Sequence, residues 1–166
     1  MDRELAELSS LLGQALSARG WMLATAESCS GGLLAGVVTA TPGSSAWFER
    51  GFVTYSNESK VELLGVAPAT LAHYGAVSEE TAREMADGAM AHSHADVAIA
   101  ITGIAGPDGG SATKPVGTVW LAWRTRNGNM QTETHCLPGE RETVRQRVVT
   151  IALARLIALA KADAGF

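Results

Sequence analysis

The residues best suited to chemistry form the octet Thr25-Ala26-Glu27-Ser28-Cys29-Ser30-Gly31-Gly32, in which hydroxyls and a thiol stand beside paired glycines. A short apolar run precedes the octet, and apolar residues at helical spacing follow it as far as the Thr-Pro-Gly breaker at 41–43. We therefore expect a strand, a tight turn and a helix. In that geometry Ser28 or Ser30 is expected to cap the helix, while the two glycines let a ligand approach unpaired backbone N–H groups. Such a turn suits a phosphate or a developing oxyanion.

A serine in this turn needs a base, because a free hydroxyl is a poor nucleophile near neutral pH. None of the four histidines stands beside a glycine-rich turn, so a Ser-His-Asp triad has no local support. A lysine can act as the base when burial lowers the pKa of its amine. Lys60 is the best candidate because it follows an expected strand, whereas Lys114 lies in a loop and Lys161 in the tail of the last helix. The alternative, that Lys60 is an ordinary solvated lysine, stays open.

Cys29 is a second candidate nucleophile, because a helix N-terminus lowers the pKa of a thiol. Successive residues at the end of a strand point to opposite faces, so we expect only one of Ser28 and Cys29 to face the ligand. The pattern does not decide between them. A small thiol buried beneath the helix is the alternative for Cys29.

Two further groups of residues invite a functional interpretation. His92 and His94 stand two positions apart, where helical side chains diverge, and no carboxylate cluster completes a metal site. We expect them to be surface histidines. Arg141 and Arg145 begin the last helix, where cations are unfavourable. A bound anion would explain these arginines, and ordinary solvated charges are the alternative.

Length and composition predict a single domain, residues 1–166, with one continuous core, since 46% of the residues are apolar. The net charge of -4 and the scattered basic residues disfavour a nucleic-acid partner. The first twenty residues have the pattern of an amphipathic helix rather than a signal peptide, and no apolar run is long enough to span a membrane. The two cysteines lie too far apart to build a disulfide framework or metal site alone. We therefore expect a reduced, cytoplasmic protein that binds neither nucleic acid nor membrane.

The elements expected to position these residues alternate between strands and helices, which predicts an α/β fold. We expect a three-layer α/β/α sandwich with a mixed sheet of about five strands. The Asn127-Gly128 pair predicts that the last two strands form an antiparallel hairpin. Ligands bind beyond the carboxyl ends of parallel strands, where the octet and the glycine-rich loop 103–110 both lie. The expected strands are 21–24, 47–55, 95–102, 117–126 and 130–137. The expected helices are 2–19, 33–38, 78–93 and 141–162, with a short helix or turn at 59–64.

The chain carries a series of ordered motifs: Thr25 to Cys29, Gly31-Gly32, Pro42 to Ser45, Phe52 to Asn57 with Lys60, Gly75 to Ser78, Gly103 to Pro107, Lys114 to Val119, and Gly139 with Arg141. Through these motifs the chain resembles, over nearly its whole length, the CinA C-terminal domain family, and within it the stand-alone nicotinamide mononucleotide deamidases. One departure is Ser30, where the family usually has threonine, but the hydroxyl is retained.

The resemblance implies an amidohydrolase that converts the carboxamide of nicotinamide mononucleotide to nicotinate mononucleotide and ammonia, in NAD recycling. It implies no metal and no cofactor. The family's serine-lysine pair carries over to Ser28 as nucleophile and Lys60 as base, and Tyr55 matches a tyrosine that relays a proton or orients the lysine. The implied substrate contacts are a hydroxyl at Thr102 and phosphate-holding guanidinium groups at Arg141 and Arg145.

We expect the backbone N–H groups of Ser30, Gly31 and Gly32 to bind the oxyanion. The family fold, a three-layer sandwich with a five-stranded mixed sheet, agrees with the predicted pattern. The alternative function is a non-catalytic nucleotide-binding or regulatory module linked to competence or the DNA-damage response. Binding a phosphate requires neither a nucleophile nor a base, so their joint presence favours the enzyme. We also expect a homo-oligomer, a dimer or higher.

Overall fold

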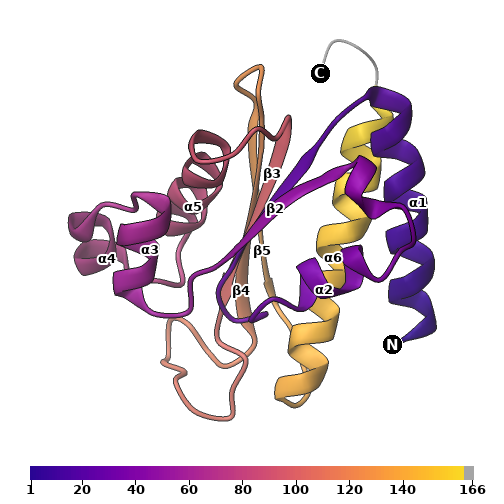
Figure 1. Cartoon of the computed structure of the whole chain (residues 1–166). Helices are drawn as coiled ribbons and strands as arrows, with labels where there is room; N and C mark the ends of the chain where they lie inside the picture. The colour runs from indigo at the N-terminus through magenta and orange to yellow at the C-terminus, as the bar shows by residue number, and fades with distance from the viewer. Residues whose placement is uncertain (163–166) are drawn as a thin grey trace.

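The computed structural model describes residues 1–162, which form a mixed five-stranded sheet with helices on both faces (Figure 1). The strand order is β2-β1-β3-β4-β5. β1 is parallel to both of its neighbours, whereas β3, β4 and β5 pair antiparallel. The predicted α/β/α sandwich and its terminal hairpin are therefore confirmed. The strands are β1 (Leu23–Glu27), β2 (Phe48–Val53), β3 (Val97–Gly103), β4 (Thr118–Thr125) and β5 (Met130–Cys136).

The helices form two layers, with α1, α2 and α6 on one face of the sheet and α3, α4 and α5 on the other (Figure 1). The sequence pattern missed α4, because this helix has only seven residues and buries none of them, so it carries no apolar period. The helices are α1 (Arg3–Arg19), α2 (Leu33–Thr39), α3 (Asn57–Leu64), α4 (Pro68–Tyr74), α5 (Glu79–Ala91) and α6 (Arg141–Lys161), with a short 3-10 turn at Ser44–Ala46.

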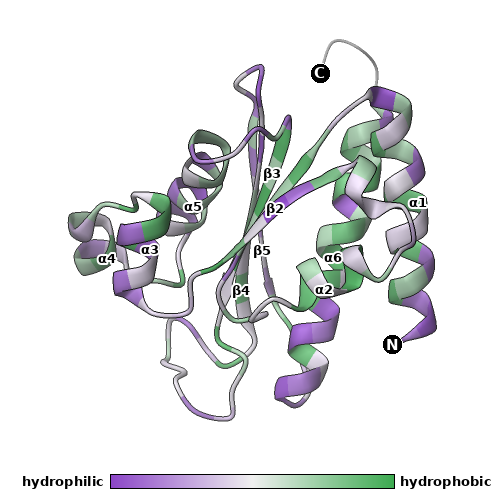
Figure 2. Ribbon diagram, viewed as in Figure 1, coloured by the Kyte–Doolittle hydropathy of each residue, from purple (hydrophilic) through white to green (hydrophobic). Residues whose placement is uncertain are grey.

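The two faces of the sheet carry different core residues, as the alternation along β3 illustrates. Val97, Ile99 and Ile101 point into the large aliphatic core beneath α1 and α6. Ala98 and Ala100 point the other way, into an alanine-rich core beneath α5. Figure 2 shows apolar residues along the inner strands and polar ones on the outer helix faces. The small side chains let α5 approach the sheet closely, and α5 in turn supports α3.

β1 extends further than predicted, to Glu27 rather than Ala24, and all five of its residues are buried. Its neighbours β2 and β3 pair with it along this whole length, so the strand continues through polar residues. The expected cap of the following helix by Ser28 or Ser30 is wrong. Gly32 occupies the N-cap of α2 with φ 96 and makes no side-chain bond. The Glu27 carboxylate takes this role instead, accepting from Leu34 N at 2.9 Å and Ala35 N at 3.0 Å.

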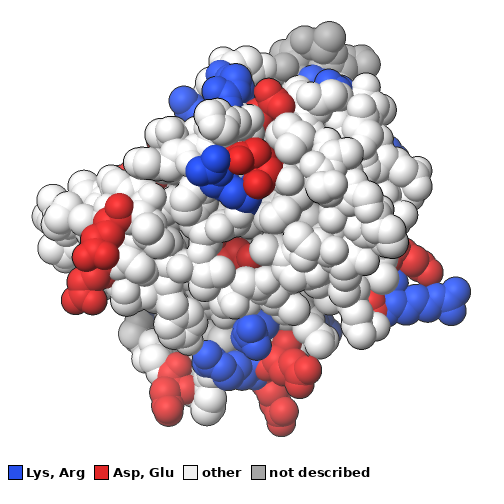
Figure 3. All heavy atoms as spheres, viewed as in Figure 1, with Lys and Arg blue, Asp and Glu red and all other residues white. Residues whose placement is uncertain are grey.

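Basic and acidic side chains lie interspersed on the face shown in Figure 3, and much of that face is uncharged. Within residues 1–162, no helix combines the length and apolarity needed to cross a membrane. The predicted single domain runs to residue 166, and its last four positions, 163–166, lie outside the described residues.

Candidate active site

A cavity of about 260 Å³ opens at the carboxyl ends of β1 and β3, where the sequence predicted the ligand crevice. Four segments build it: the turn after β1, the residues around the start of α3, the loop after β3 and the first residue of α6. The connection between α4 and α5, at 76–77, closes another side. The polar side chains that line the cavity are Ser28, Tyr55, Lys60, Thr102, Asp108 and Arg141.

Ser28 and Lys60 meet in this cavity, although they are 32 residues apart in the chain. The backbone N of Ser28 donates to Ile101 O of β3 at 2.9 Å, which fixes the residue directly after β1. Lys60 lies on α3, a helix capped by the side chain of Ser56. Its Nζ lies 2.9 Å from Ser28 Oγ, 2.8 Å from Thr54 O and 3.4 Å from Tyr55 O. The alternative of a solvated lysine is wrong, because Lys60 is 0% exposed.

The environment of Lys60 shifts its side chain toward the neutral amine. Burial lowers the pKa of its side chain, because the charged form loses its hydration. Within the described residues no carboxylate forms an ion pair with Nζ. A neutral amine has two N–H groups and one lone pair. With the N–H groups directed to the two backbone carbonyls, the lone pair is left for the Ser28 hydroxyl, as a general base requires.

Cys29 is buried and belongs to the aliphatic core beneath α1 and α6, as the alternative of a packed thiol expects, and it is also among the residues that line the cavity. Burial raises the pKa of the Cys29 thiol to about 11, and the charge of Glu27 adds to this effect. The thiol is therefore protonated at neutral pH and is a poor nucleophile. A Cβ at Gly103 would lie 3.1 Å from its sulfur, so a small residue is needed there.

Tyr55 and Arg141 form the rim of the cavity. The Tyr55 side chain is 62% exposed, and its hydroxyl accepts from Arg141 Nη2 at 2.9 Å. Arg141 Nη1 donates to Gly106 O at 2.8 Å, which ties the start of α6 to the loop after β3. Tyr55 therefore faces Lys60 with its backbone carbonyl, while its hydroxyl lies against Arg141.

The other predicted substrate contacts divide into two groups. Thr102 lines the cavity, and its hydroxyl donates to Ala76 O at 2.8 Å. Ser30, Gly31, Gly32 and Arg145 are not among the lining residues. Arg145 donates from Nε to Cys29 O at 3.3 Å and from Nη2 to Ser30 O at 3.0 Å. The substrate-binding roles of all these residues stay predictions.

Sequence reasoning missed two residues of the site. Glu27 is 0% exposed, and its carboxylate joins the end of β1 to the first turn of α2. The available signal was an acidic residue in a buried strand, directly before a turn and a helix. Asp108 is the one carboxylate among the residues that line the cavity. It stands in a loop rich in glycine, where no local pattern distinguishes a ligand contact from a solvated charge.

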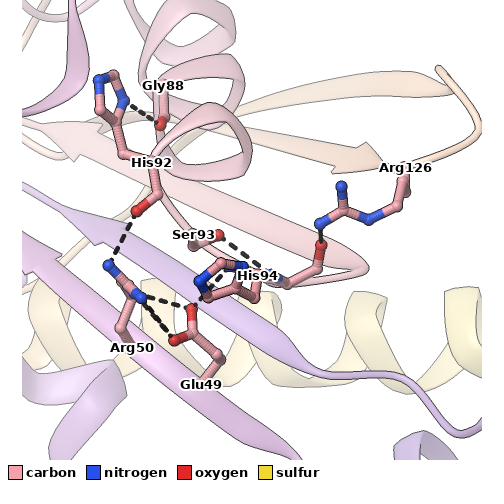
Figure 4. A network of polar contacts seen from close by, with 8 residues as sticks. Glu49, Arg50, Gly88, His92, Ser93, His94 and Arg126 are labelled. Atoms are coloured by element: carbon pink, nitrogen blue, oxygen red, sulfur yellow. Dashed lines mark hydrogen bonds and ion pairs between the residues drawn. The ribbon is translucent and has the colours of Figure 1, made fainter.

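The predicted surface histidines are not among the residues that line the cavity, and they belong to a separate network of polar contacts (Figure 4). His92 and His94 are exposed and belong to a network that joins the end of α5 to the start of β2. Arg50 donates to His92 O at 3.0 Å and pairs with Glu49, whose carboxylate also accepts from His94 N at 3.1 Å. Among residues 1–162, no three His, Cys, Asp or Glu side chains are grouped to hold a metal ion.

Comparison with known proteins adds independent evidence. Residues 5–160 match the family model for the CinA C-terminal domain. Nicotinamide-nucleotide amidohydrolase PncC of Escherichia coli K12 is 56% identical over 155 residues, which cover 93% of this chain and 94% of that protein. PncC of Pseudomonas putida is 48% identical over 152 residues, covering 92% and 94%. The crystal structure of competence/damage inducible protein CihA from Agrobacterium tumefaciens superimposes with a TM-score of 0.94 at 47% identity, covering 97% of this chain and 98% of that one. The chain belongs to the CinA C-terminal domain family.

Proposed function

We propose that this chain is a nicotinamide mononucleotide amidohydrolase, which releases ammonia from the carboxamide and leaves nicotinate mononucleotide for NAD recycling. The observation that carries the proposal is the 2.9 Å contact between Ser28 Oγ and the buried amine of Lys60, inside a cavity. The names of the PncC relatives, which match over more than nine tenths of both chains, support the same substrate.

The proposed reaction uses Ser28 as nucleophile and Lys60 as base. As Ser28 Oγ attacks the carboxamide carbon, its proton passes to the neutral amine of Lys60. The resulting ammonium returns this proton to the departing nitrogen, so ammonia leaves and an ester remains on Ser28. A water molecule then gives a proton to Lys60 and attacks the ester. Nicotinate mononucleotide leaves as the proton returns to Ser28.

The remaining residues would bind and orient the substrate. The exposed guanidinium of Arg141 suits the phosphate, and the neighbouring hydroxyl of Tyr55 would hold that guanidinium at the rim. The pyridinium ring of the substrate is positively charged, and the Asp108 carboxylate complements that charge. The hydroxyl of Thr102 would face the reacting group. The backbone N–H groups of Ser30 to Gly32 stay our proposal for the oxyanion.

Ammonia release from nicotinamide mononucleotide tests the proposal directly. We expect the wild-type protein to release ammonia, and Ser28→Ala and Lys60→Ala to lose at least about a thousandfold in kcat. Lys161→Ala is the matched control, since this exposed lysine lies at the far end of α6 and should leave the rate unchanged. A wild-type protein that releases no ammonia, or a Ser28→Ala variant as fast as wild type, would refute the mechanism.

The same experiment separates the alternative function, a regulatory module that binds nucleotide without turnover. A relative from Symbiobacterium thermophilum, 53% identical over 155 residues, is named a putative competence-damage inducible protein, and this chain covers 36% of it. Binding of nicotinamide mononucleotide without release of ammonia would favour that module. The cytoplasmic location and the homo-oligomeric state stay predictions.

A further inference from the structure

We propose that Arg145 is a positioning residue for the turn that carries the nucleophile, residues 28–32, rather than a ligand of the substrate phosphate. This inference rests on the proposed function, because it concerns the rate of that reaction. It assigns different roles to Arg141 and Arg145, which lie one turn apart on the same helix and for which the sequence predicts the same role.

The contacts of Arg145 are made with the turn and not with the cavity. Nε and Nη2 of its guanidinium reach the consecutive carbonyls of Cys29 and Ser30, at 3.3 and 3.0 Å. The group also packs against the turn, since a Cβ on Gly31 would lie 3.4 Å from Nη2. Arg141 lines the cavity and Arg145 does not. Arg145 therefore holds the turn from the side away from the substrate.

The other bonds of this turn do not reach the Cys29 carbonyl. Gly31 N donates to Ser28 O at 3.0 Å, and Leu33 N donates to Ser30 O at 2.9 Å. The N-cap of α2 is a glycine at φ 96 without a side-chain bond, and the helix has only seven residues. Glu27 fixes Leu34 N and Ala35 N, which lie beyond the turn. Within the described residues, Arg145 is the one hydrogen-bond donor to the Cys29 carbonyl. The orientation of the peptide between Cys29 and Ser30 therefore depends on this guanidinium.

The orientation of that peptide matters for catalysis. In a trans peptide the C=O and the following N–H point in opposite directions. When Arg145 holds the Cys29 carbonyl, the N–H of Ser30 points away from Arg145. Ser30 N–H is one of the donors that we propose for the oxyanion. The positive charge also strengthens the bonds to the carbonyls and polarises the peptides, which makes their N–H groups better donors.

A positioning role and a phosphate role predict different kinetics. The oxyanion develops only in the transition state, so losing Arg145 should lower kcat and leave substrate affinity nearly unchanged. A phosphate contact exists in the ground state as well, so its loss should weaken binding. The dissociation constant of nicotinamide mononucleotide can be measured by calorimetry in a Ser28→Ala background, where no turnover occurs.

For Arg145→Ala we expect kcat for ammonia release to fall about ten- to a hundredfold, as for a modest displacement of catalytic groups. The dissociation constant measured in the Ser28→Ala background should change by less than about threefold, whereas Arg141→Ala should raise it about tenfold or more. Arg145→Lys should also have a low kcat, because one ammonium does not reproduce the fork that serves two carbonyls. Added methylguanidinium should restore part of the kcat of Arg145→Ala. Arg147→Ala removes an exposed charge from the same helix and should match wild type.

Two results would overturn the inference. One is an Arg145→Ala variant with wild-type kcat at saturating substrate and a dissociation constant raised tenfold. The other is an Arg145→Lys variant that keeps wild-type kcat, since a phosphate contact tolerates any cation there. If Arg145→Ala does not fold, as circular dichroism would show, Arg145→Lys alone decides between the roles. A folded wild-type protein that releases no ammonia would instead refute the proposed function itself.

Discussion

Replacing Glu27 with glutamine tests how the turn that carries the nucleophile is anchored. The carboxylate is fully buried, and each of its oxygens accepts one backbone N–H at the start of α2. In Glu27→Gln one oxygen remains an acceptor, while the other becomes an NH2 group that faces an N–H. One charge-assisted bond is lost, and two buried donors are left opposed.

The size of the effect follows from these contacts. A hydrogen bond to a charged group contributes about 1.5–3 kcal/mol, and an unsatisfied buried donor costs about 1–3 kcal/mol. We therefore expect Glu27→Gln to lower the free energy of unfolding by about 3 kcal/mol. For a chain of this length, each kcal/mol lowers Tm by about 2–4 °C, so Tm should fall by about 6–12 °C.

Thermal and urea unfolding followed by circular dichroism measure this change. Glu58→Gln is the matched control, because Glu58 lies in the first turn of α3 and is exposed. Its loss should cost less than about 1 kcal/mol. If Glu27→Gln and Glu58→Gln unfold at the same temperature, the carboxylate does not anchor α2 and the reasoning is wrong. The ammonia assay should also show a lower kcat for Glu27→Gln, because Ser28 follows directly.

The same structure supports five further predictions. Burial lowers the pKa of Lys60, so kcat should rise with pH, with a midpoint below 10.5, the ordinary pKa of a lysine. A pH profile of kcat with its midpoint above 10.5 would contradict this. Between the lowered pKa and 10.5 the unfolded chain binds more protons, so the free energy of unfolding should increase with pH, and Lys60→Met should remove that slope in urea titrations. Cys29 has a buried side chain and a thiol pKa of about 11, so it should resist iodoacetamide at pH ~8 until the protein unfolds. The exposed Cys136 should react under the same conditions, and peptide mass mapping would distinguish the two cysteines. A Cβ on Gly88 would lie 1.9 Å from Leu64 O, so Gly88→Ala should lower the free energy of unfolding by at least about 1–3 kcal/mol and displace α3 with Lys60. A Cβ on Gly36 would have no atom within 4 Å, so Gly36→Ala should instead raise the free energy of unfolding by about 0.5–1 kcal/mol. Asp108→Asn should raise KM for nicotinamide mononucleotide at unchanged kcat, because the carboxylate is proposed to contact its positively charged pyridinium ring. An unchanged KM would exclude that contact.

The sequence by itself determined the elements whose signals are local. The alternation of large and small residues in β3, the Asn127-Gly128 turn and the long apolar period of α6 each depend on neighbours in the chain. The fold class followed from their order. The short helix α4 and the last residues of β1 were missed, because tertiary pairing stabilises them and their own composition does not signal it.

The chemistry of the site depends on contacts between distant segments, and only the tertiary structure decided these. Burial lowers the pKa of Lys60, and this burial depends on how α3 packs in the fold, including its contact with α5. The same packing brings the amine to Ser28, and no local pattern encodes that contact. The same holds for Arg141 and Arg145, which share a residue type and a helix. Arg141 lines the cavity, whereas Arg145 donates to the carbonyls of Cys29 and Ser30 in the turn. The packing of α6 against the sheet decides which groups each guanidinium can contact.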